Sequence, residues 1–436
     1  MDHIVPTFYK TYGKYVNESR AFPLDVDGLK PVERRVLLSA FQVAKDKLVK
    51  SARVDGHTIA NFHPHGTSYS TLVNLVQMKF LEGQGNFGCN FGVDPSPPAA
   101  MRYTEVKLSK ETLELAFRYI QHVPWVESEL EKEPKYLPTM FPFCLLGNEF
   151  TVGIGFGYRT QIPCFKKEDL FQRLLFHLGI RKTRPIIKPV TDCDIVSPDK
   201  EIEKLLTTGK ATLEMKGRAE VDKSKCRAVI KSWPYGRRFE SFLSKFSKEL
   251  ENQDIGFADL STTETSILFQ VMKQRNRDAI FQRFLKKLES ALRGTVTFET
   301  IVVDLAGKVY NTSIDSLLIG TYNMFTNVNK MMIRSEISKI TELMGEYQTL
   351  DKIRPVLSKH LQGKVLDVEK VIQDIHKETY VEIKVIKDLF AKYRINKLLT
   401  LNTDTEELQE KNKQLIVDFD NIREFVLNQY RNFLKK

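Results

Sequence analysis

The chain has 436 residues, too many for one ordinary domain, and this length predicts two to four domains. Hydrophobic residues make up 42% and charged residues 28%, a balance that excludes a disordered chain. The net charge of +11 favours a polyanionic partner, either a nucleic acid or an anionic membrane surface, although a merely basic soluble protein fits equally well.

The sequence shows neither a membrane segment nor the cysteine pattern of an oxidising compartment. No apolar run approaches the roughly 20 residues that span a bilayer, and the first ten residues lack the basic-then-apolar order of a signal peptide. The cysteines contain no CxxC pair, which argues against a zinc site and a disulfide framework: Cys89, Cys144, Cys164, Cys193 and Cys226. We therefore expect a cytoplasmic protein with no membrane partner.

Residues 28–80 are predicted to form helices separated by short breaks. Pro31 suits the first turn of a helix whose apolar positions include Val36 and Leu37. A second helix is expected to begin at Thr67 or Ser68, because both are good capping residues. Two short helices around a break are typical of a helix-turn-helix unit that enters a DNA groove, although such pairs are also common in other proteins.

The middle of the chain changes to a strand-like period. Apolar and polar residues alternate over 213–221, the segment 222–225 has the composition of a turn, and a return strand is expected from Ala228. A helix-rich stretch over roughly 235–292 and a strand over 296–303 complete the region. The pattern predicts an α+β domain between helical regions.

Heptad spacing returns towards the end of the chain. Apolar residues lie seven apart in two stretches: Ile333, Ile340 and Tyr347, and later Leu408, Leu415 and Ile422. Two such helices predict an antiparallel coiled coil, and the alternative is that both pack on a globular core. The segment between them, residues 355–399, is apolar but short, so we expect a helical knob too small for its own core, which would be a natural dimer contact.

The segment with the clearest chemistry is Ala99–Glu105, which contains Arg102 and Tyr103. A tyrosine hydroxyl, with an ordinary pKa of about 10, attacks a phosphodiester only when positive charge lies close by. The guanidinium of Arg102 supplies a planar donor fork suited to a phosphate. The dipeptide alone indicates little, because most tyrosines are half-buried packing residues.

Other segments add groups that suit a phosphate. Basic residues surround the sequence DGLKPVERR, and His63 and His65 precede a predicted helix N-terminus, which favours anions. A glycine-rich loop over 83–88 can bring backbone amides near a phosphate. The two histidines could instead bind zinc, but no thiolate or third imidazole has suitable spacing.

Five motifs occur in one order: DGLKPVERR, FHPHGTS, EGQGNFG, AAMRYTE and LLGNEFTVGIGFGY. In these motifs the chain resembles the breakage-reunion subunit of type IIA DNA topoisomerases, the gyrase A and ParC kind. Within that family it is most similar to the branch of T-even phage medium subunits, which would place it in the host cytoplasm. The resemblance covers nearly the whole chain, without the DNA-wrapping domain that follows in gyrase A, so we expect relaxation or decatenation rather than supercoiling.

The resemblance implies a catalytic group of four residues. Tyr103 is expected to be the nucleophile that becomes joined to the 5′ phosphate of the DNA. Arg102 and Arg20 are expected to hold and neutralise that phosphate, and His65 to support the transition state.

The resemblance also implies DNA contacts. Lys30 and Arg35 match positions that bind the backbone of the cut segment, and His63 lies beside the catalytic histidine. Ile154 matches an apolar wedge that enters a base step and bends the DNA, which suits an isoleucine exposed by a tight turn between two glycines. Ser68 matches the serine of the bacterial quinolone site.

Two positions depart from the bacterial pattern. Glu33 stands where many relatives carry histidine, so no role is assigned to it. Leu72 stands where they usually carry an acid, so we expect drug contacts bridged through a metal and water to be weak. Quinolone poisoning as strong as that of gyrase in a cleavage titration would contradict this expectation.

No nucleotide or metal motif is convincing. The chain lacks a GxxxxGK[ST] loop, and Gly153–Gly157 is followed too soon by Pro163 to open a dinucleotide-binding helix. Asp192 and Asp194 have the bare DxD spacing of the family's magnesium site, but a turn is the simpler interpretation. We expect a partner subunit to bind both ATP and Mg²⁺, the metal clamping the scissile phosphate.

The sequence thus predicts a multidomain, mainly α chain with an α+β part that binds double-stranded DNA and acts as a homodimer. The expected segments are a partner-contacting arm (1–19), a winged-helix or helix-turn-helix cleavage domain (20–145), an α+β tower (146–318), and an antiparallel coiled coil (319–352 and 400–436) bearing a dimerisation knob (353–399). A tyrosine recombinase is disfavoured because no histidine is followed by arginine at His-x-x-Arg spacing. A non-catalytic architectural DNA binder stays open.

Overall fold

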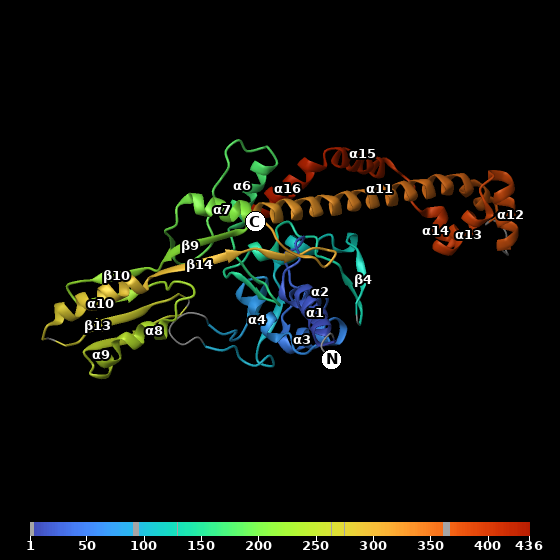
Figure 1. Cartoon of the computed structure of the whole chain (residues 1–436). Helices are drawn as coiled ribbons and strands as arrows, with labels where there is room; N and C mark the ends of the chain where they lie inside the picture. Colours follow the sequence, from blue (N-terminus) through green and yellow to red (C-terminus); the bar gives the residue numbers. More distant parts are fainter. Residues whose placement is uncertain (1–3, 90–95, 129, 263, 274, 361–366) are drawn as a thin grey trace. The chain divides into compact units, whose positions relative to one another are not determined.

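The computed structural model describes residues 4–89, 96–128, 130–262, 264–273, 275–360 and 367–436. The chain divides into two compact units, residues 1–325 with 432–436, and residues 326–431. Helices and sheets are mixed along the chain (Figure 1). No helix of the described residues is long and apolar enough to cross a membrane.

The first unit begins with helices. They are α1 (Ile4–Val16), the π-helical turn η1 (Asn17–Ala21), α2 (Pro31–Val43), α3 (Ser51–Asn61) and α4 (Tyr69–Gln77). Pro31 occupies the first turn of α2, as predicted, and the side chain of Glu33 accepts from the backbone N–H of Lys30 at 2.8 Å to complete the cap. The second predicted helix, α4, follows Ser68. Helix α3 was not distinguished in the sequence pattern.

A three-stranded antiparallel sheet packs with these helices. Its order is β1-β3-β2, from β1 (Val49–Lys50), β2 (Leu81–Gln84) and β3 (Glu105–Leu108). In the register, Val106 of β3 faces Val49 on one side and Gly83 on the other. Because β3 begins two residues after Tyr103, the central strand of this sheet fixes the end of the Tyr103 segment.

Short elements link this part to the next. They are α5 (Lys110–Thr112), η2 (Leu113–Phe117), η3 (Ile120–His122), the antiparallel pair β4 (Trp125–Glu127) and β5 (Lys132–Pro134), and η4 (Phe143–Leu145).

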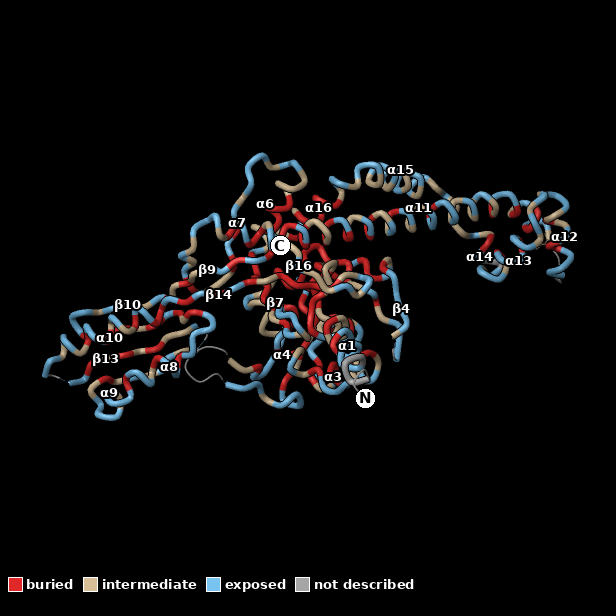
Figure 2. The backbone as a smooth tube through the Cα atoms, in the orientation of Figure 1, coloured by how far each residue is buried: buried red, intermediate tan, exposed pale blue. Residues whose placement is uncertain are grey.

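A five-stranded sheet follows, with the order β6-β7-β14-β9-β8. Its strands are β6 (Thr151–Ile154), β7 (Arg159–Ile162), β8 (Asp194–Ile195), β9 (Lys210–Lys216) and β14 (Arg293–Glu299), accompanied by α6 (Lys167–His177) and α7 (Asp199–Thr208). The pair β15 (Ile301–Val303) and β16 (Val309–Asn311) continues the chain after β14. Figure 2 shows buried segments gathered around these strands.

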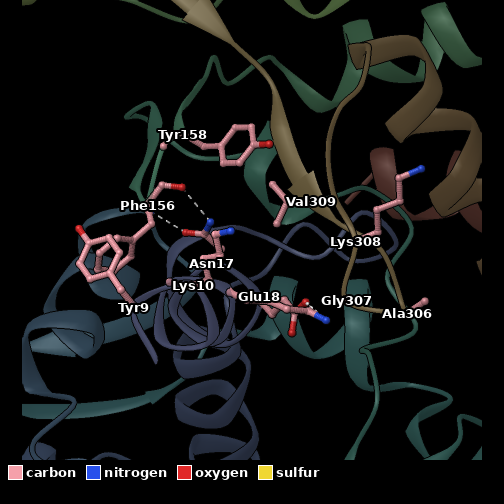
Figure 3. A pocket seen from close by; sticks show the side chains of 13 residues that line it. Tyr9, Lys10, Asn17, Glu18, Phe156, Tyr158, Ala306, Gly307, Lys308 and Val309 are labelled. Carbon is pink, nitrogen blue, oxygen red and sulfur yellow. Dashed lines mark hydrogen bonds and ion pairs between the residues drawn. The ribbon is translucent and has the colours of Figure 1, made fainter. Parts of the chain in front are cut away.

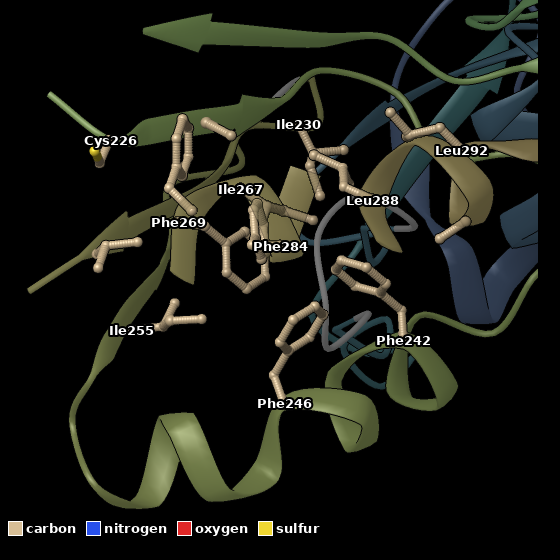
Figure 4. Packing of buried hydrophobic residues seen from close by; sticks show 14 of the residues in the cluster. Cys226, Ile230, Phe242, Phe246, Ile255, Ile267, Phe269, Phe284, Leu288 and Leu292 are labelled. Carbon is tan, nitrogen blue, oxygen red and sulfur yellow. The ribbon is translucent and has the colours of Figure 1, made fainter. Parts of the chain in front are cut away.

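A second, four-stranded sheet is inserted between β9 and β14, with the order β10-β11-β13-β12. It contains β10 (Ala219–Asp222), β11 (Arg227–Ile230), β12 (Ile255–Asp259) and β13 (Ile267–Val271), with α8 (Phe239–Leu243), η5 (Ser244–Phe246), α9 (Ser247–Glu251) and α10 (Arg277–Ala291). The predicted hairpin around 222–225 is confirmed, but the strand predicted over 213–221 is two strands of different sheets, because β9 ends at Lys216 and β10 begins at Ala219. Phenylalanines from helices and strands fill the core of this sheet, among them Phe242, Phe246, Phe269 and Phe284 (Figure 4).

The helix-rich prediction for residues 235–292 is therefore wrong in part, because β12 and β13 lie inside it. Four of the five residues of β13 are apolar, so composition does not separate its inward positions from its outward ones. A strand of this kind cannot be told from a buried helix by periodicity alone.

The second unit is helical. Helix α11 (Ile314–His360) runs into it from the first unit, and α12 (Val368–Thr379), α13 (Ile383–Lys392), α14 (Ile395–Thr400), α15 (Glu406–Asp420) and α16 (Ile422–Leu434) follow. Gln429 Nε2 donates to Asn329 Oδ1 at 2.7 Å, and Lys411 Nζ lies 3.8 Å from a carboxylate oxygen of Glu336, so the returning helices run in the opposite direction to α11. Helix α15 contains no fully buried residue, and its heptad positions Leu408, Leu415 and Phe419 are half-buried.

The predicted knob has a core of its own, contrary to our expectation. Its ten buried apolar residues come from the end of α11 and from α12, α13 and α14: Leu350, Ile353, Val356, Leu357, Val371, Ile372, Ile375, Ile386, Leu389 and Leu398. The expectation failed because the last turns of α11, which continue to His360, contribute four of these residues. Because this segment has its own core, the expected lack of one cannot be used to argue that the segment is a dimer contact.

Candidate active site

Tyr103 lies on a segment that is anchored on both sides of an exposed ring. Thr104 is fully buried, its hydroxyl donates to Ser51 Oγ at 2.7 Å, and Tyr69 Oη donates to the carbonyl of Ala99 at 2.6 Å. The backbone N–H of Tyr103 donates to Ala100 O at 2.9 Å. The side chain of Tyr103 is nevertheless 64% exposed, so the fold holds the backbone firmly and presents the phenol to solvent.

The glycine-rich loop over residues 83–88 contacts the Tyr103 segment. The N–H of Ala99 donates to Asn86 O at 2.9 Å. Gly85 has a φ of +111°, and a Cβ at this position would lie 3.3 Å from the carbonyl oxygen of Tyr103. A glycine is required here because L side chains rarely adopt this backbone conformation. The loop thus contacts the Tyr103 segment, and it is also held by Gln77 of α4, whose Nε2 donates to Phe87 O at 2.9 Å.

Two arginines lie over tyrosine rings rather than against carboxylates. The guanidinium carbon of Arg102 is 4.6 Å from the ring centroid of Tyr103, and that of Arg20 is 5.7 Å from the ring centroid of Tyr15. Among the described residues neither makes a salt bridge, whereas Arg34 and Arg35 are both paired with carboxylates. A positive charge without a counter-charge, held by cation–π contact, is suited to receive an anion.

Several of the other predicted site residues are linked to one another by successive side-chain contacts in the first unit. Tyr15 Oη lies 3.3 Å from His65 Nε2, and the rings of His65 and His63 meet edge to face at 5.3 Å. His63 Nδ1 lies 3.3 Å from Arg35 Nη1, and Arg35 binds both carboxylate oxygens of Glu133 at 2.8 and 2.9 Å. We call Tyr15, Arg20, His63, His65 and Arg35 the histidine cluster.

The structure therefore joins Arg20 to His65 through Tyr15, a residue that the sequence reasoning missed. Helix α1 carries the exposed aromatics Tyr9, Tyr12 and Tyr15 at helical spacing, and this stripe was a usable signal. Among the described residues the phenol of Tyr103 contacts Arg102 and makes no hydrogen bond, so within one chain it is not bonded to the histidine cluster.

Lys30 and Ser68 point their polar atoms into the chain. Lys30 Nζ donates to Val152 O at 2.7 Å. Ser68 is only 2% exposed, and both its N–H and its hydroxyl donate to Asp55 Oδ1, at 2.7 and 2.8 Å. The carboxylate of Asp55 thereby fixes the residue that precedes α4, and the Ser68 hydroxyl is occupied with a structural bond.

Ile154 ends β6 and is 75% exposed, more than any other isoleucine described as an exposed large hydrophobic residue. The tight-turn explanation for its glycine neighbours is incomplete, because neither Gly153 nor Gly155 has a positive φ. A Cβ on Gly153 would instead lie 2.1 Å from Ala21 O, and one on Gly155 would lie 2.3 Å from Asn17 Oδ1. Close approach of η1 to the hairpin is what requires glycine.

Burial dominates the electrostatics beneath the site. Asp27 and Arg34 form a buried ion pair at 2.7 Å under the start of α2. Loss of solvent raises the pKa of Glu33 above its ordinary value, although Lys30 and Arg34 oppose the shift. Burial likewise raises the pKa of the Cys144 thiol. These groups support the fold of the site and do not face the exposed phenol.

The donor set around Tyr103 does not fit a metal ion. No group of three or more His, Cys, Asp or Glu side chains among the described residues could hold one. The nearest carboxylate in sequence, Glu105, pairs with Lys50 Nζ at 2.9 Å. Asp192 lies in a bend and its carbonyl accepts from Arg218, while Asp194 begins β8.

The chain is similar to known proteins over most of its length. Residues 20–436 match the family of the A subunits of DNA gyrase and topoisomerase IV. The A subunit of DNA gyrase from Haemophilus influenzae is 31% identical over 322 residues, covering 68% of this chain and 36% of the relative. The A subunit of DNA topoisomerase 4 from Escherichia coli is 33% identical over 58% of this chain and 35% of the relative.

A third relative aligns almost end to end with this chain. The A subunit of DNA gyrase from Thermotoga maritima is 26% identical over 451 aligned residues, which cover 95% of this chain and 54% of the relative. The chain thus spans about a third to a half of the length of the curated relatives it matches.

Proposed function

The chain belongs to the family of DNA gyrase and topoisomerase IV A subunits, and on this premise we propose that it is the DNA-breaking and rejoining subunit of a type II DNA topoisomerase, with Tyr103 as its nucleophile. The observation that carries the proposal is an exposed phenol on a rigid segment, with the unpaired charge of Arg102 against its ring. An architectural DNA binder has no need of either feature.

The proposed reaction is a transesterification. The phenolic oxygen of Tyr103 attacks the phosphorus of a backbone phosphodiester, the bond from phosphorus to the 3′ oxygen breaks, and the phenolic proton is lost as the 3′ oxygen gains one. The DNA is left with a 5′-phosphotyrosine bond and a 3′ hydroxyl. Rejoining is the reverse attack by that hydroxyl. One phosphodiester is exchanged for another, so cleavage and resealing need no ATP.

Arg102 and Arg20 are proposed to neutralise the phosphate as charge develops on its oxygens. Charged donors aimed at developing charge commonly contribute about 10²–10³-fold to a rate. Within the histidine cluster, Arg20 lies over the ring of Tyr15, and the hydroxyl of Tyr15 lies 3.3 Å from His65 Nε2. Since the phenol of Tyr103 is not bonded to that cluster within the chain, the scissile phosphate itself, or a second copy of the chain, would have to bridge the two groups.

DNA contacts are proposed for Lys30, Arg35, His63 and Ile154. Arg35 and Lys30 would have to exchange their present partners, Glu133 and Val152 O, for backbone phosphates. The net charge of +11 favours that exchange through release of counterions. Ile154 would enter a base step from the end of its hairpin. We do not include Ser68, because its hydroxyl is occupied by Asp55.

The finer architecture is proposed on the family relationship. Residues 20–145 would act as a winged-helix cleavage domain, 146–318 as a tower, 319–352 and 400–436 as a coiled coil, and 353–399 as the dimer contact. Tyr380, 87% exposed at the end of α12, is the most exposed large apolar side chain described and suits that contact. A homodimer would place two Tyr103 residues on opposite strands and so produce a double-strand break.

A partner subunit is proposed to bind ATP and Mg²⁺. The carboxylates of this chain do not form a metal site among the described residues. Magnesium held by that partner would clamp the scissile phosphate and stabilise the leaving 3′ oxygen. Energy from ATP would drive passage of a second duplex through the break, which leads to relaxation or decatenation.

Tyr103→Phe tests the proposal. The variant keeps the ring under Arg102 and loses only the attacking oxygen, so DNA binding should stay within about twofold while detergent-trapped covalent complexes disappear. The assay uses the chain with its ATPase subunit, Mg²⁺ and end-labelled duplex. Tyr235→Phe, an exposed tyrosine outside both the Tyr103 segment and the Ile154 hairpin, is the matched control and should cleave like wild type. Covalent complexes that persist in Tyr103→Phe refute the assignment, and their absence from the wild type favours an architectural DNA binder.

A further inference from the structure

The exposed Ile154 is carried by a short hairpin. Strands β6 and β7 pair over four residues each, and the turn is closed by Gly155 N donating to Tyr158 O at 3.0 Å. The hairpin is the edge of the five-stranded sheet and is joined to β14 through the pair of Gln161 and Glu299, so its turn extends beyond that pairing. A two-stranded end of this size has little stability of its own. An apolar side chain that enters a base step must overcome stacking of the bases, so a hairpin that bends away under load would fail to insert it.

Asn17 fixes the turn of this hairpin. Its Nδ2 donates to the carbonyl of Phe156 at 3.0 Å, and its Oδ1 accepts from the N–H of the same residue at 2.7 Å (Figure 3). The two bonds satisfy both backbone groups of one turn residue, as a neighbouring strand would. Asn17 is only 7% exposed, so water does not readily compete for these bonds.

The exposed tyrosines of α1 also contact the turn of this hairpin. The ring of Phe156 meets Tyr9 and Tyr12 edge to face, with centroids 5.2 and 5.7 Å apart. On the other side of the turn, Gly155 approaches Asn17 so closely that a Cβ would lie 2.3 Å from Oδ1 and 2.7 Å from the ring of Phe22. The backbone of the hairpin is therefore held by an amide and aromatic rings together.

Asn17 also lies between the residues that organise the histidine cluster. It begins η1, which ends one residue after Arg20, and Tyr15 precedes it by two residues. The same turn of chain thus sets both Arg20 and the base of the Ile154 hairpin. A shift of η1 would move the proposed phosphate contact and the proposed wedge together.

We propose that Asn17 is a positioning residue for DNA bending: its paired bonds to Phe156 hold the β6–β7 hairpin so that Ile154 is inserted rather than deflected. This inference rests on the proposed function, because it assigns Asn17 to the deformation of the DNA that is cut. Asn17 itself touches neither the DNA nor the phosphate. Its effect is to stiffen the hairpin that carries Ile154.

The test measures bending separately from binding. A duplex labelled at both ends is bound to the full chain in complex with its partner subunit, and energy transfer between the labels gives the bent fraction. Asn17→Ala should lower the ratio of bent to unbent duplex about thirtyfold, which is the loss expected for two hydrogen bonds. Asn17→Asp keeps the acceptor for Phe156 N–H, but it buries a charge and sets a carboxylate oxygen against the carbonyl of Phe156, so it should lose at least as much. Ile154→Ala gives the bent fraction that is expected of a hairpin without the wedge side chain.

Two further variants separate a local effect from unfolding. Gly155→Ala disturbs the same contact from the hairpin side and should reproduce the loss of bending with Asn17 intact. Asn421→Ala removes an asparagine that bonds to Val417 O in the second unit, and should bend DNA like wild type. A duplex with mismatched pairs at its centre bends at a lower cost, so on it Asn17→Ala should recover bending and covalent-complex formation.

The inference is overturned if Asn17→Ala bends the matched duplex as much as Asn421→Ala does. It is also overturned by an equal loss on matched and mismatched duplexes, because that outcome indicates general damage to the fold. The inference and the proposed function fail in different ways. If the wild type bends DNA through Asn17 but forms no covalent adduct, the cleavage function is lost and the positioning role remains.

Discussion

Asp27 offers a sharp test of how the site is supported, because each of its carboxylate oxygens accepts two hydrogen bonds. Oδ1 accepts from Leu29 N at 3.0 Å and from Arg34 Nη2 at 2.9 Å. Oδ2 accepts from Arg34 Nε at 2.7 Å and from Leu137 N at 3.0 Å. The residue is fully buried, so water cannot replace these bonds.

Asp27→Asn replaces one of the two oxygens with an NH₂ group. Whichever way the amide is turned, two of the four bonds become contacts between donors, and Arg34 loses its counter-charge. Removing one partner of a buried ion pair costs about 3–5 kcal/mol. Arg34 keeps its bond to Leu29 O at 3.1 Å, which offsets little of that loss.

Hydrogen exchange of the α2 backbone, followed by mass spectrometry on the full chain, measures this loss locally. Since about 1.4 kcal/mol corresponds to a factor of ten, protection in residues 31–43 should fall by about two to four orders of magnitude. Peptides from the second unit should be unchanged and serve as the internal control. Protection in α2 within threefold of the wild type would refute the reasoning that this pair supports the helix carrying Arg35.

Three further predictions concern charge and burial. Burial raises the pKa of Glu33 above its ordinary value of 4.5, so the stability that this residue contributes is fully present below that value and is lost as pH rises through the folded pKa. The melting temperature of Glu33→Gln should therefore rise relative to that of the wild type as pH increases above 4.5. A difference that stays constant with pH would contradict this. Burial raises the pKa of the Cys164 thiol to about 11, which leaves roughly a thousandth of this thiol as thiolate at pH 8. Maleimide should therefore label the partly exposed Cys89 before Cys164. Equal labelling rates of the two cysteines, measured by mass spectrometry, would be inconsistent with the burial of Cys164. Arg102→Ala should reduce the rate of covalent-complex formation by about 10²–10³-fold with DNA affinity changed only a few-fold, and a loss confined to affinity would assign Arg102 to binding instead.

Local signals in the sequence were sufficient for several elements. Pro31 marks the start of α2, and α4 follows Ser68, although the Ser68 hydroxyl bonds to Asp55 and does not cap the helix. The alternation around the turn at 222–225 identifies the β10–β11 hairpin. These signals work because the determining residues lie within a few positions of one another.

Contacts between distant segments were not predictable in this way. Lys30 and Val152 are 122 residues apart in sequence, and Arg35 and Glu133 are 98 apart, so their bonds depend on the tertiary fold. The phenylalanine core beside β13 recruits helices and strands alike, which hides the strand period. The glycines around Ile154 suggested a turn, but their small size serves the close approach of Asn17 and Ala21.

The central claim is that one phenolic oxygen of this chain becomes bonded to DNA. The most direct measurement is peptide mapping of the residue left attached to radiolabelled DNA after a cleavage reaction is denatured and digested with protease. The account predicts a single labelled peptide that contains Tyr103, with the phosphate on its hydroxyl. A label on another residue, or on none while the DNA is cut, would contradict it.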